Sequence, residues 1–152
     1  MIFEKILDTK EQMFYNGRRG DVMIKENNFE REAVTAFRKY ARYGYDKSNL
    51  SFFEICDSAR GAAPDAESAA EIVAVYLTLQ ALENFSRRET ADAVRKVYFR
   101  YADRPLKKNE ISWRVRRFAS EGYMDERTVY RHLRAAKTLF AKFYQNGIKN
   151  IK

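Results

Sequence analysis

The sequence is poor in the residues that build disulfide frameworks and metal clusters. Its 152 residues include one cysteine, Cys56, and one histidine, His132. One thiol cannot form an internal disulfide, and one thiol with one imidazole does not supply the ligand set of a structural zinc site. A lone free thiol is typical of proteins in the reducing cytoplasm. We therefore predict a cytoplasmic protein without a metal or other cofactor.

Long apolar runs are missing as well. The N-terminal segment reaches charge at Glu4, before any run long enough for a signal peptide. The longest apolar stretch, Ala69–Leu82, is interrupted by Glu71 and Gln80 and is too short to span a bilayer. We expect a soluble protein with no membrane partner.

Motifs of common enzymes are also lacking. The chain has neither a phosphate-binding loop of the G-x-x-x-x-G-K-S/T type nor a serine nucleophile elbow. His132, Arg134 and Tyr144 match residue types of a tyrosine recombinase, but that enzyme needs a second arginine and a longer chain. We therefore predict a binding protein with no catalytic residues.

The residues that are present favour a compact helical protein. Hydrophobic residues make up 45% of the chain and aromatic residues 14%, which is too apolar for a disordered protein. Apolar residues recur at intervals of three and four, as in a helix with one buried face. We predict an all-α fold, a helical bundle with a C-terminal helix-turn-helix. The predicted helices span residues 29–43, 48–59, 65–85, 88–101, 109–121 and 125–143.

Capping and helix-breaking residues set the predicted helix ends. Ser48 or Asn49 is expected to cap the second helix, and Asp65 to cap the third. The fourth helix is expected to end at Arg104-Pro105, because proline resists continuation of a helix. The side chains predicted to face inward from the second and fourth helices are Phe52, Phe53, Ile55, Cys56, Val94, Val97, Tyr98 and Tyr101.

The first 28 residues allow two interpretations. Apolar spacing between Phe3 and Phe14 permits a helix, which a loop would follow. Asn16-Gly17 before Val22-Met23-Ile24 also permits a hairpin. We favour the helix and loop.

Charge divides the chain into unlike halves. Residues 1–84 carry 11 Lys and Arg against 14 Asp and Glu, whereas residues 85–152 carry 18 against 7. Arginine outnumbers lysine in the basic half, and its planar fork suits phosphate and guanine. This distribution predicts a nucleic-acid partner for the second half. A fragment that starts near Phe85 is therefore expected to bind DNA by itself.

We divide the chain at residue 63. Residues 1–63 are a predicted N-terminal helical segment without an assigned role. Residues 64–152 are a predicted helical dimerisation arm and helix-turn-helix DNA-binding region. The arm is inferred from a broad apolar face on the 65–85 helix, formed by Ile72, Val75, Tyr76, Leu79 and Leu82.

Two capped helices near the C-terminus carry the function. Asn109 is expected to cap the first and Asp125 the second, with a break at Gly122 between them. Two short helices joined by a glycine turn form the helix-turn-helix pattern, whose second helix enters the major groove. The predicted buried face of that second helix comprises Val129, Leu133, Ala136, Phe140 and Phe143.

The segment Asp125-Glu126-Arg127-Thr128-Val129-Tyr130-Arg131-His132 resembles the S-x-R-T-V-Y-R recognition helix of sigma factor region four. It is most similar to the ArpU/RinA-type phage transcriptional regulators, in which a basic and aromatic run precedes the helix-turn-helix, here at residues 94–101. The resemblance covers residues 88–143. It implies a sequence-specific, double-stranded DNA-binding transcriptional regulator of phage or mobile-element origin.

The predicted DNA contacts surround these two helices. They are Lys107, Lys108, Arg114, Arg117, Arg127, Thr128, Tyr130, Arg131, Arg134 and Lys137. One recognition helix reads only a few base pairs, so we expect a homodimer or RNA polymerase to complete recognition. An alternative is a non-enzymatic phage adaptor or inhibitor, for DNA packaging or against host defence, with the acidic half as its working surface.

Aromatic residues in the basic half raise a rival interpretation. Single-stranded nucleic acid stacks on exposed aromatic rings. However, Tyr98, Tyr101, Tyr123, Tyr130 and Tyr144 mostly fall on predicted helices, so we expect most of them in the core. Core packing is also the expectation for Trp113.

Overall fold

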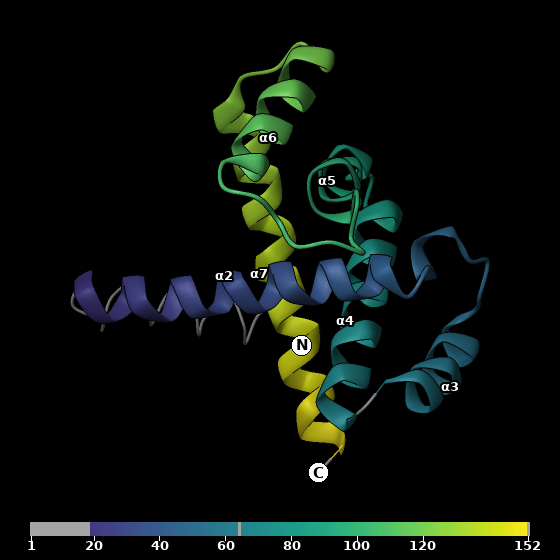
Figure 1. Ribbon diagram of the computed structural model, residues 1–152. Coiled ribbons are helices and arrows are strands. Elements are labelled where there is room, and N and C mark those ends of the chain that lie inside the picture. Colours follow the sequence, from purple (N-terminus) through teal and green to yellow (C-terminus); the bar gives the residue numbers. More distant parts are fainter. Residues whose placement is uncertain (1–18, 64, 152) are drawn as a thin grey trace.

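The computed structural model describes residues 19–63 and 65–151, and their side chains for residues 29–63 and 65–146. Within these ranges the chain forms helices and no strand, which confirms the all-α prediction (Figure 1). The elements are α2 (Arg19–Arg42), the 3-10 turn η1 (Tyr45–Lys47), α3 (Phe52–Ala62), α4 (Ala66–Asn84), α5 (Arg88–Val94), the π-helical η2 (Arg95–Phe99), α6 (Glu110–Glu121) and α7 (Glu126–Ile151).

The long C-terminal helix α7 is the centre of the bundle. It packs along α4 and also contacts α5, α2 and α6, while α3 packs on α4. Figure 1 shows α2 crossing α7, with α6 near one end of α7 and the C-terminus at the other. Phe37 of α2 anchors this crossing, because its ring lies 5.7 Å from the rings of both Tyr98 and Phe140.

The N-terminal part of α2 is helical where the sequence predicted a loop or a hairpin. It begins at Arg19, so Val22, Met23 and Ile24 lie in a helix, and both the hairpin and the loop are wrong there. The helix expected between Phe3 and Phe14 lies outside the described residues. The amphipathic 29–43 segment is confirmed as the C-terminal part of α2, which stops before Gly44 at φ 80°.

Capping residues explain where α3 and α4 start. The Asp65 side chain accepts the backbone N–H of Ser68 at 2.7 Å, as predicted. For α3 the cap is Ser51, which accepts the N–H of Glu54 at 3.3 Å, and not Ser48 or Asn49. Ile55 of this helix is buried, while Phe52 and Phe53 are exposed. The prediction that both phenylalanines face inward is wrong.

The fourth predicted helix is shorter and wider than expected. It changes into a π-helical turn at Arg95 and ends at Phe99, five residues before Arg104-Pro105. The wider turn directs three consecutive side chains, Val97, Tyr98 and Phe99, into the core. Tyr101 adopts φ 51° and is exposed, so its predicted inward orientation is wrong.

The apolar face of α4 is occupied within the chain. Ile72, Val75, Leu79 and Leu82 are at most 4% exposed and belong to the hydrophobic core, against which Tyr76 packs. This face is therefore not available as the predicted dimerisation surface. The core joins residues of α2, α3 and α4 with residues of α5, α6 and α7, so no boundary at residue 63 separates two cores.

Among the described residues, none of the helices has both the length and the apolar composition required to cross a membrane.

Candidate nucleic-acid interface

Helices α6 and α7 are joined by a tight turn at residues 122–125. The N–H of Tyr123 donates to the Ser120 carbonyl at 3.3 Å, and that of Met124 donates to the Ala119 carbonyl at 2.9 Å. This pair of bonds is a Schellman motif, whose left-handed position normally holds glycine. Here Tyr123 occupies it at φ 52°, while Gly122 keeps a negative φ of −93°. The predicted break lies at the right place, but Tyr123 makes the turn.

The start of α7 exposes one cationic face. Asp125 caps the helix as predicted, accepting the N–H of Arg127 at 3.3 Å. Val129, Leu133, Ala136 and Phe140 are buried and Phe143 is half-buried, which confirms the predicted inner face. The outward positions hold the predicted residues Arg127, Tyr130, Arg131 and Arg134, and Thr128 is half-buried beside them.

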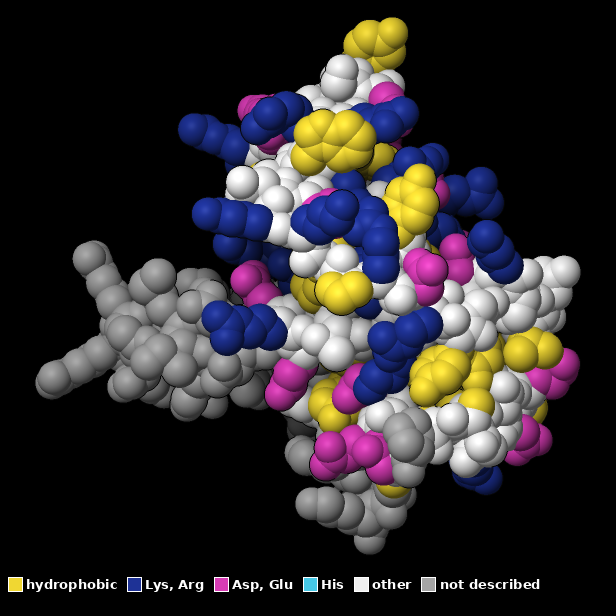
Figure 2. Space-filling view, viewed as in Figure 1, with side chains coloured by type: hydrophobic (Ala, Val, Ile, Leu, Met, Phe, Trp, Pro, Cys, Tyr) yellow, Lys and Arg dark blue, Asp and Glu magenta, His cyan; other side chains and the backbone are white. Residues whose placement is uncertain are grey.

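The arginines of the cationic face are largely without ion pairs. Among the described residues, Arg127 and Arg131 form no ion pair, and Arg134 lies only at the limit of one, 4.0 Å from Glu30. In Figure 2, Lys and Arg side chains gather over the upper part of the molecule, around α5 and α6, while Asp and Glu are more frequent below. On this face of the molecule, the charge division seen in the sequence is therefore also a division in space.

The segment before α6 and the outer face of α6 extend this surface. Lys107 and Lys108 are exposed, as is Arg117, which pairs with Glu121 at 3.1 Å. Arg116 was not predicted; it is exposed and lies 3.8 Å from Glu126 of α7. The sequence could have indicated this residue, because it is adjacent to the predicted contact Arg117 on the same helix.

Two predicted DNA contacts face the interior. The Arg114 side chain is 6% exposed and donates to the Val97 carbonyl at 2.7 Å and to Glu110. Lys137 is mostly buried, with its ammonium 5.6 Å from the Tyr98 ring centre. Burial lowers the pKa of this lysine. Both predictions are wrong, because these cations are used inside the protein.

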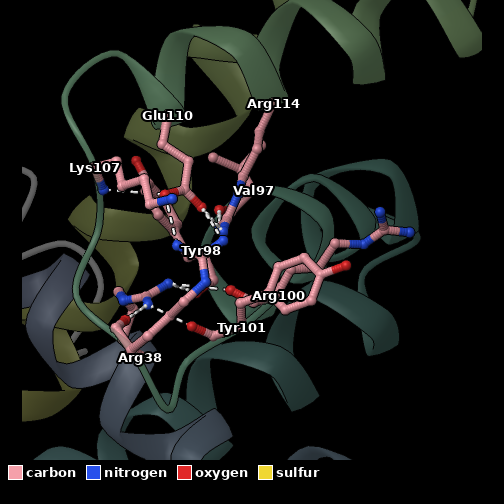
Figure 3. Close-up of polar contacts among 9 residues, drawn as sticks. Arg38, Val97, Tyr98, Arg100, Tyr101, Lys107, Glu110 and Arg114 are labelled. Carbon is pink, nitrogen blue, oxygen red and sulfur yellow. Dashed lines mark hydrogen bonds and ion pairs between the residues drawn. The ribbon is translucent and has the colours of Figure 1, made fainter.

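Arg38 binds the segment between η2 and α6, and Arg114 joins the two elements that flank it. Figure 3 shows Arg38 beside the carbonyl oxygens of this segment and Arg114 reaching Val97 of η2 and Glu110 of α6. Arg38 donates to the carbonyl oxygens of Tyr98, Arg100, Tyr101 and Arg104 at 3.0, 3.2, 2.8 and 2.6 Å. Sequence analysis missed this role of Arg38, because its acceptors are backbone atoms about 60 positions away.

Glu110 ties the same segment to the first turn of α6. Its carboxylate accepts the N–H of Lys107 at 3.0 Å and also binds Arg104 and Arg114. The Lys107 N–H and the Arg104 hydrogen bond lower the pKa of Glu110 to about 2. Asn109 stands at the predicted start of α6, but at φ 66° and without a side-chain capping bond, so its predicted capping bond is absent.

Several aromatic residues expected in the core are exposed instead. Trp113 is 56% exposed, Tyr101 63% and Tyr123 98%, and Tyr130 is exposed as well. Only Tyr98 of the five tyrosines considered is fully buried, so the expectation for most of them and for Trp113 is wrong. Helical spacing identifies a face, but it does not show whether another element covers that face.

His132 is used in a contact between two helices of the bundle. Its Nδ1 lies 2.8 Å from the Thr90 hydroxyl of α5, and its side chain is half-buried beside the exposed arginines of α7. In the described part of the chain, no group of His, Cys, Asp and Glu residues is placed to hold a metal ion.

Comparisons of this chain with protein-family models, curated proteins and solved structures found no match.

Proposed function

We propose that the chain is a sequence-specific, double-stranded DNA-binding protein that regulates transcription, with α6 and α7 acting as a helix-turn-helix. The observation that carries this proposal is the outward face of α7. Arg127 and Arg131 lie one turn apart just after the capped start of the helix, without an ion-pair partner among the described residues. Arginines in this position reach guanine edges in the major groove.

The neighbouring cations support the same orientation on DNA. Lys107 and Lys108 precede α6, and Arg116 and Arg117 lie on its outer turn. Lysine acts on phosphate as a point charge and positions a protein without reading sequence. We therefore propose that α7 contacts the DNA bases and that the cations around α6 contact the phosphates.

The similarity of residues 125–132 to sigma factor region four supports a phage regulator of the ArpU/RinA type. A single recognition helix specifies few base pairs. We propose that a second copy of the chain or RNA polymerase completes recognition. The buried face of α4 cannot be the contact between two copies.

The experiment starts from selection of preferred duplexes from a random library by the full chain. On the selected duplex, Arg131→Ala is expected to weaken binding by about 1–3 kcal/mol and to relax preference at one base position. The matched control is Lys108→Ala, which should weaken binding to selected and scrambled duplexes alike and reduce the salt slope by about one.

For the unmodified chain, contact with five to eight phosphates gives a slope of log affinity against log salt of about −4 to −7. A flat salt response would overturn nucleic-acid binding. Equal losses for Arg131→Ala and Lys108→Ala on both duplexes would overturn reading by α7. The adaptor or inhibitor would then be the better account.

A further inference from the structure

A cleft between the end of η2 and the outer face of α6 has features of a different site. Its volume is about 170 Å³, and it is lined by Lys96, Arg100, Tyr101, Trp113, Arg117 and Phe118, with Arg114 and Glu121 completing it. A cavity of about 150 Å³ accommodates one benzene-sized ring. The cleft therefore has room for one planar ring of a pyrimidine, and its open side admits a larger base.

Aromatic surface and positive charge meet in this cleft. The Arg117 guanidinium lies 5.5 Å from the Trp113 ring centre, yet the indole is still 56% exposed. Among the described residues Lys96 and Arg100 form no ion pair, and the one carboxylate that lines the cleft, Glu121, pairs with Arg117. Exposed rings beside unpaired cations suit a base with its phosphate.

Tyr101 is held outward at the rim by the backbone. It adopts φ 51°, and Arg38 binds its carbonyl oxygen at 2.8 Å. Its ring lies 5.0 Å from the Arg104 guanidinium carbon. A left-handed tyrosine with an exposed ring is a strained arrangement of the kind found at ligand sites.

A second hollow continues from the cleft. It has a volume of about 610 Å³ and shares Arg100 and Tyr101 with the first. Arg42 and Lys47 also line it, and neither has an ion-pair partner in the described part of the chain. Two carboxylates line it as well: Asp46 pairs with Arg95 at 2.9 Å, and Asp103 has no ion pair with a described residue. Cations on both sides of Tyr101 fit a chain of phosphates better than a single free nucleotide.

We propose that this cleft binds an unpaired nucleotide of single-stranded nucleic acid, with the base against Trp113 and Tyr101 and the phosphates on Lys96, Arg100 and the adjoining cations. Stacking on an aromatic side chain contributes about 5- to 150-fold in affinity per base. One base alone therefore binds weakly, and neighbouring phosphates supply the remaining affinity. The site does not depend on α7 and goes beyond the proposed reading of duplex DNA.

Trp113 is the one tryptophan of the chain, so its fluorescence reports directly on the cleft. The full chain is titrated with oligothymidylate, with an abasic strand of equal length, with thymidine monophosphate and with a blunt duplex. We expect saturable quenching by oligothymidylate at much lower concentration than by the monophosphate. The abasic strand should bind about 5- to 150-fold more weakly than oligothymidylate in a competition assay.

Variants locate the binding site with a labelled oligothymidylate. Trp113→Ala and Tyr101→Ala should each lose affinity within the same 5- to 150-fold range, and Lys96→Ala and Arg100→Ala should each reduce the salt slope by about 0.7. The control is Arg60→Ala, an exposed arginine on α3 away from the cleft, which should leave binding unchanged. Thermal unfolding of each variant excludes loss of the fold as the cause.

Three results would overturn the proposal: equal affinity for the abasic strand, equal affinity for the free monophosphate, or unchanged binding in the Trp113 and Tyr101 variants. Failure here is distinguishable from failure of the proposed function, because Arg131→Ala should weaken duplex binding and leave oligothymidylate binding intact.

Discussion

The Arg38 guanidinium of α2 donates a hydrogen bond to the Arg104 carbonyl oxygen at 2.6 Å and thereby joins the N-terminal helices to the segment that leads into α6. The same group binds the carbonyls of Tyr98, Arg100 and Tyr101, and its side chain is buried. Both proposed nucleic-acid sites lie next to this segment. Their geometry therefore depends on a residue from the acidic half of the chain.

Replacing Arg38 with methionine should destabilise the fold by more than about 3 kcal/mol, because four carbonyl groups lose their donor at once. Arg31→Ala is the control, since Arg31 is an exposed arginine two turns earlier on α2. Urea unfolding of both variants provides the measurement. A loss below 1 kcal/mol for Arg38→Met would show that these bonds contribute little.

Substitution of Arg114 and of Arg117 should change the free energy of unfolding by different amounts, because Arg114 is buried and Arg117 is exposed. Arg114→Ala leaves the buried Val97 carbonyl without its donor and removes one of the three partners of the Glu110 carboxylate, so we expect a loss of about 2–4 kcal/mol in unfolding free energy. Arg117→Ala removes an exposed pair with Glu121 and an exposed contact with the Trp113 ring, and should cost less than about 1 kcal/mol. Similar losses for the two would contradict the interior position of Arg114.

The left-handed backbone of Tyr123 should lower the stability of the fold, and its exposed side chain should contribute no compensating packing. Tyr123→Gly removes the left-handed strain of a residue with a Cβ atom, and the ring is 98% exposed, so no packing is lost. We expect a gain of up to about 1 kcal/mol, measured as a higher thermal midpoint. Tyr123→Ala keeps the Cβ atom and should give little change, and an equal gain for both would exclude backbone strain as the cause.

The Glu110 carboxylate should make the fold sensitive to acid. Its pKa in the folded protein is about 2, below the usual value of 4.5, so the stabilisation is complete above pH 4.5 and is lost as the pH falls toward 2. Glu110→Gln cannot titrate there. The difference in thermal midpoint between wild type and Glu110→Gln should therefore shrink between pH 5 and pH 2. A constant difference would show that the carboxylate is not held in its charged form by folding.

A fragment of residues 85–152 should not fold alone, contrary to the sequence-based expectation. Phe140 contacts Phe37 of α2, and α7 packs along α4, so the fragment would expose one side of the core. We expect weak helical circular dichroism without a cooperative thermal transition. A sharp transition would show that the C-terminal helices form an independent unit.

The sequence by itself determined the helices whose signals are local. Asp65 caps α4, Asp125 caps α7, and the buried positions of α7 follow from a spacing of three and four residues. The predicted cations Arg127, Arg131 and Arg134 are exposed for the same reason, since they lie opposite that apolar face. Local hydrogen bonds and helical periodicity act within a few residues, so they can be read without knowledge of the fold.

Only the tertiary structure decided which faces are covered and by what. Arg114 is buried and binds the Val97 carbonyl, whereas Trp113, one position earlier, is 56% exposed. The apolar face of α4 meets helices of its own chain, so it is not left for a second copy. These outcomes depend on contacts between residues 17 to more than 60 positions apart, which no local pattern encodes.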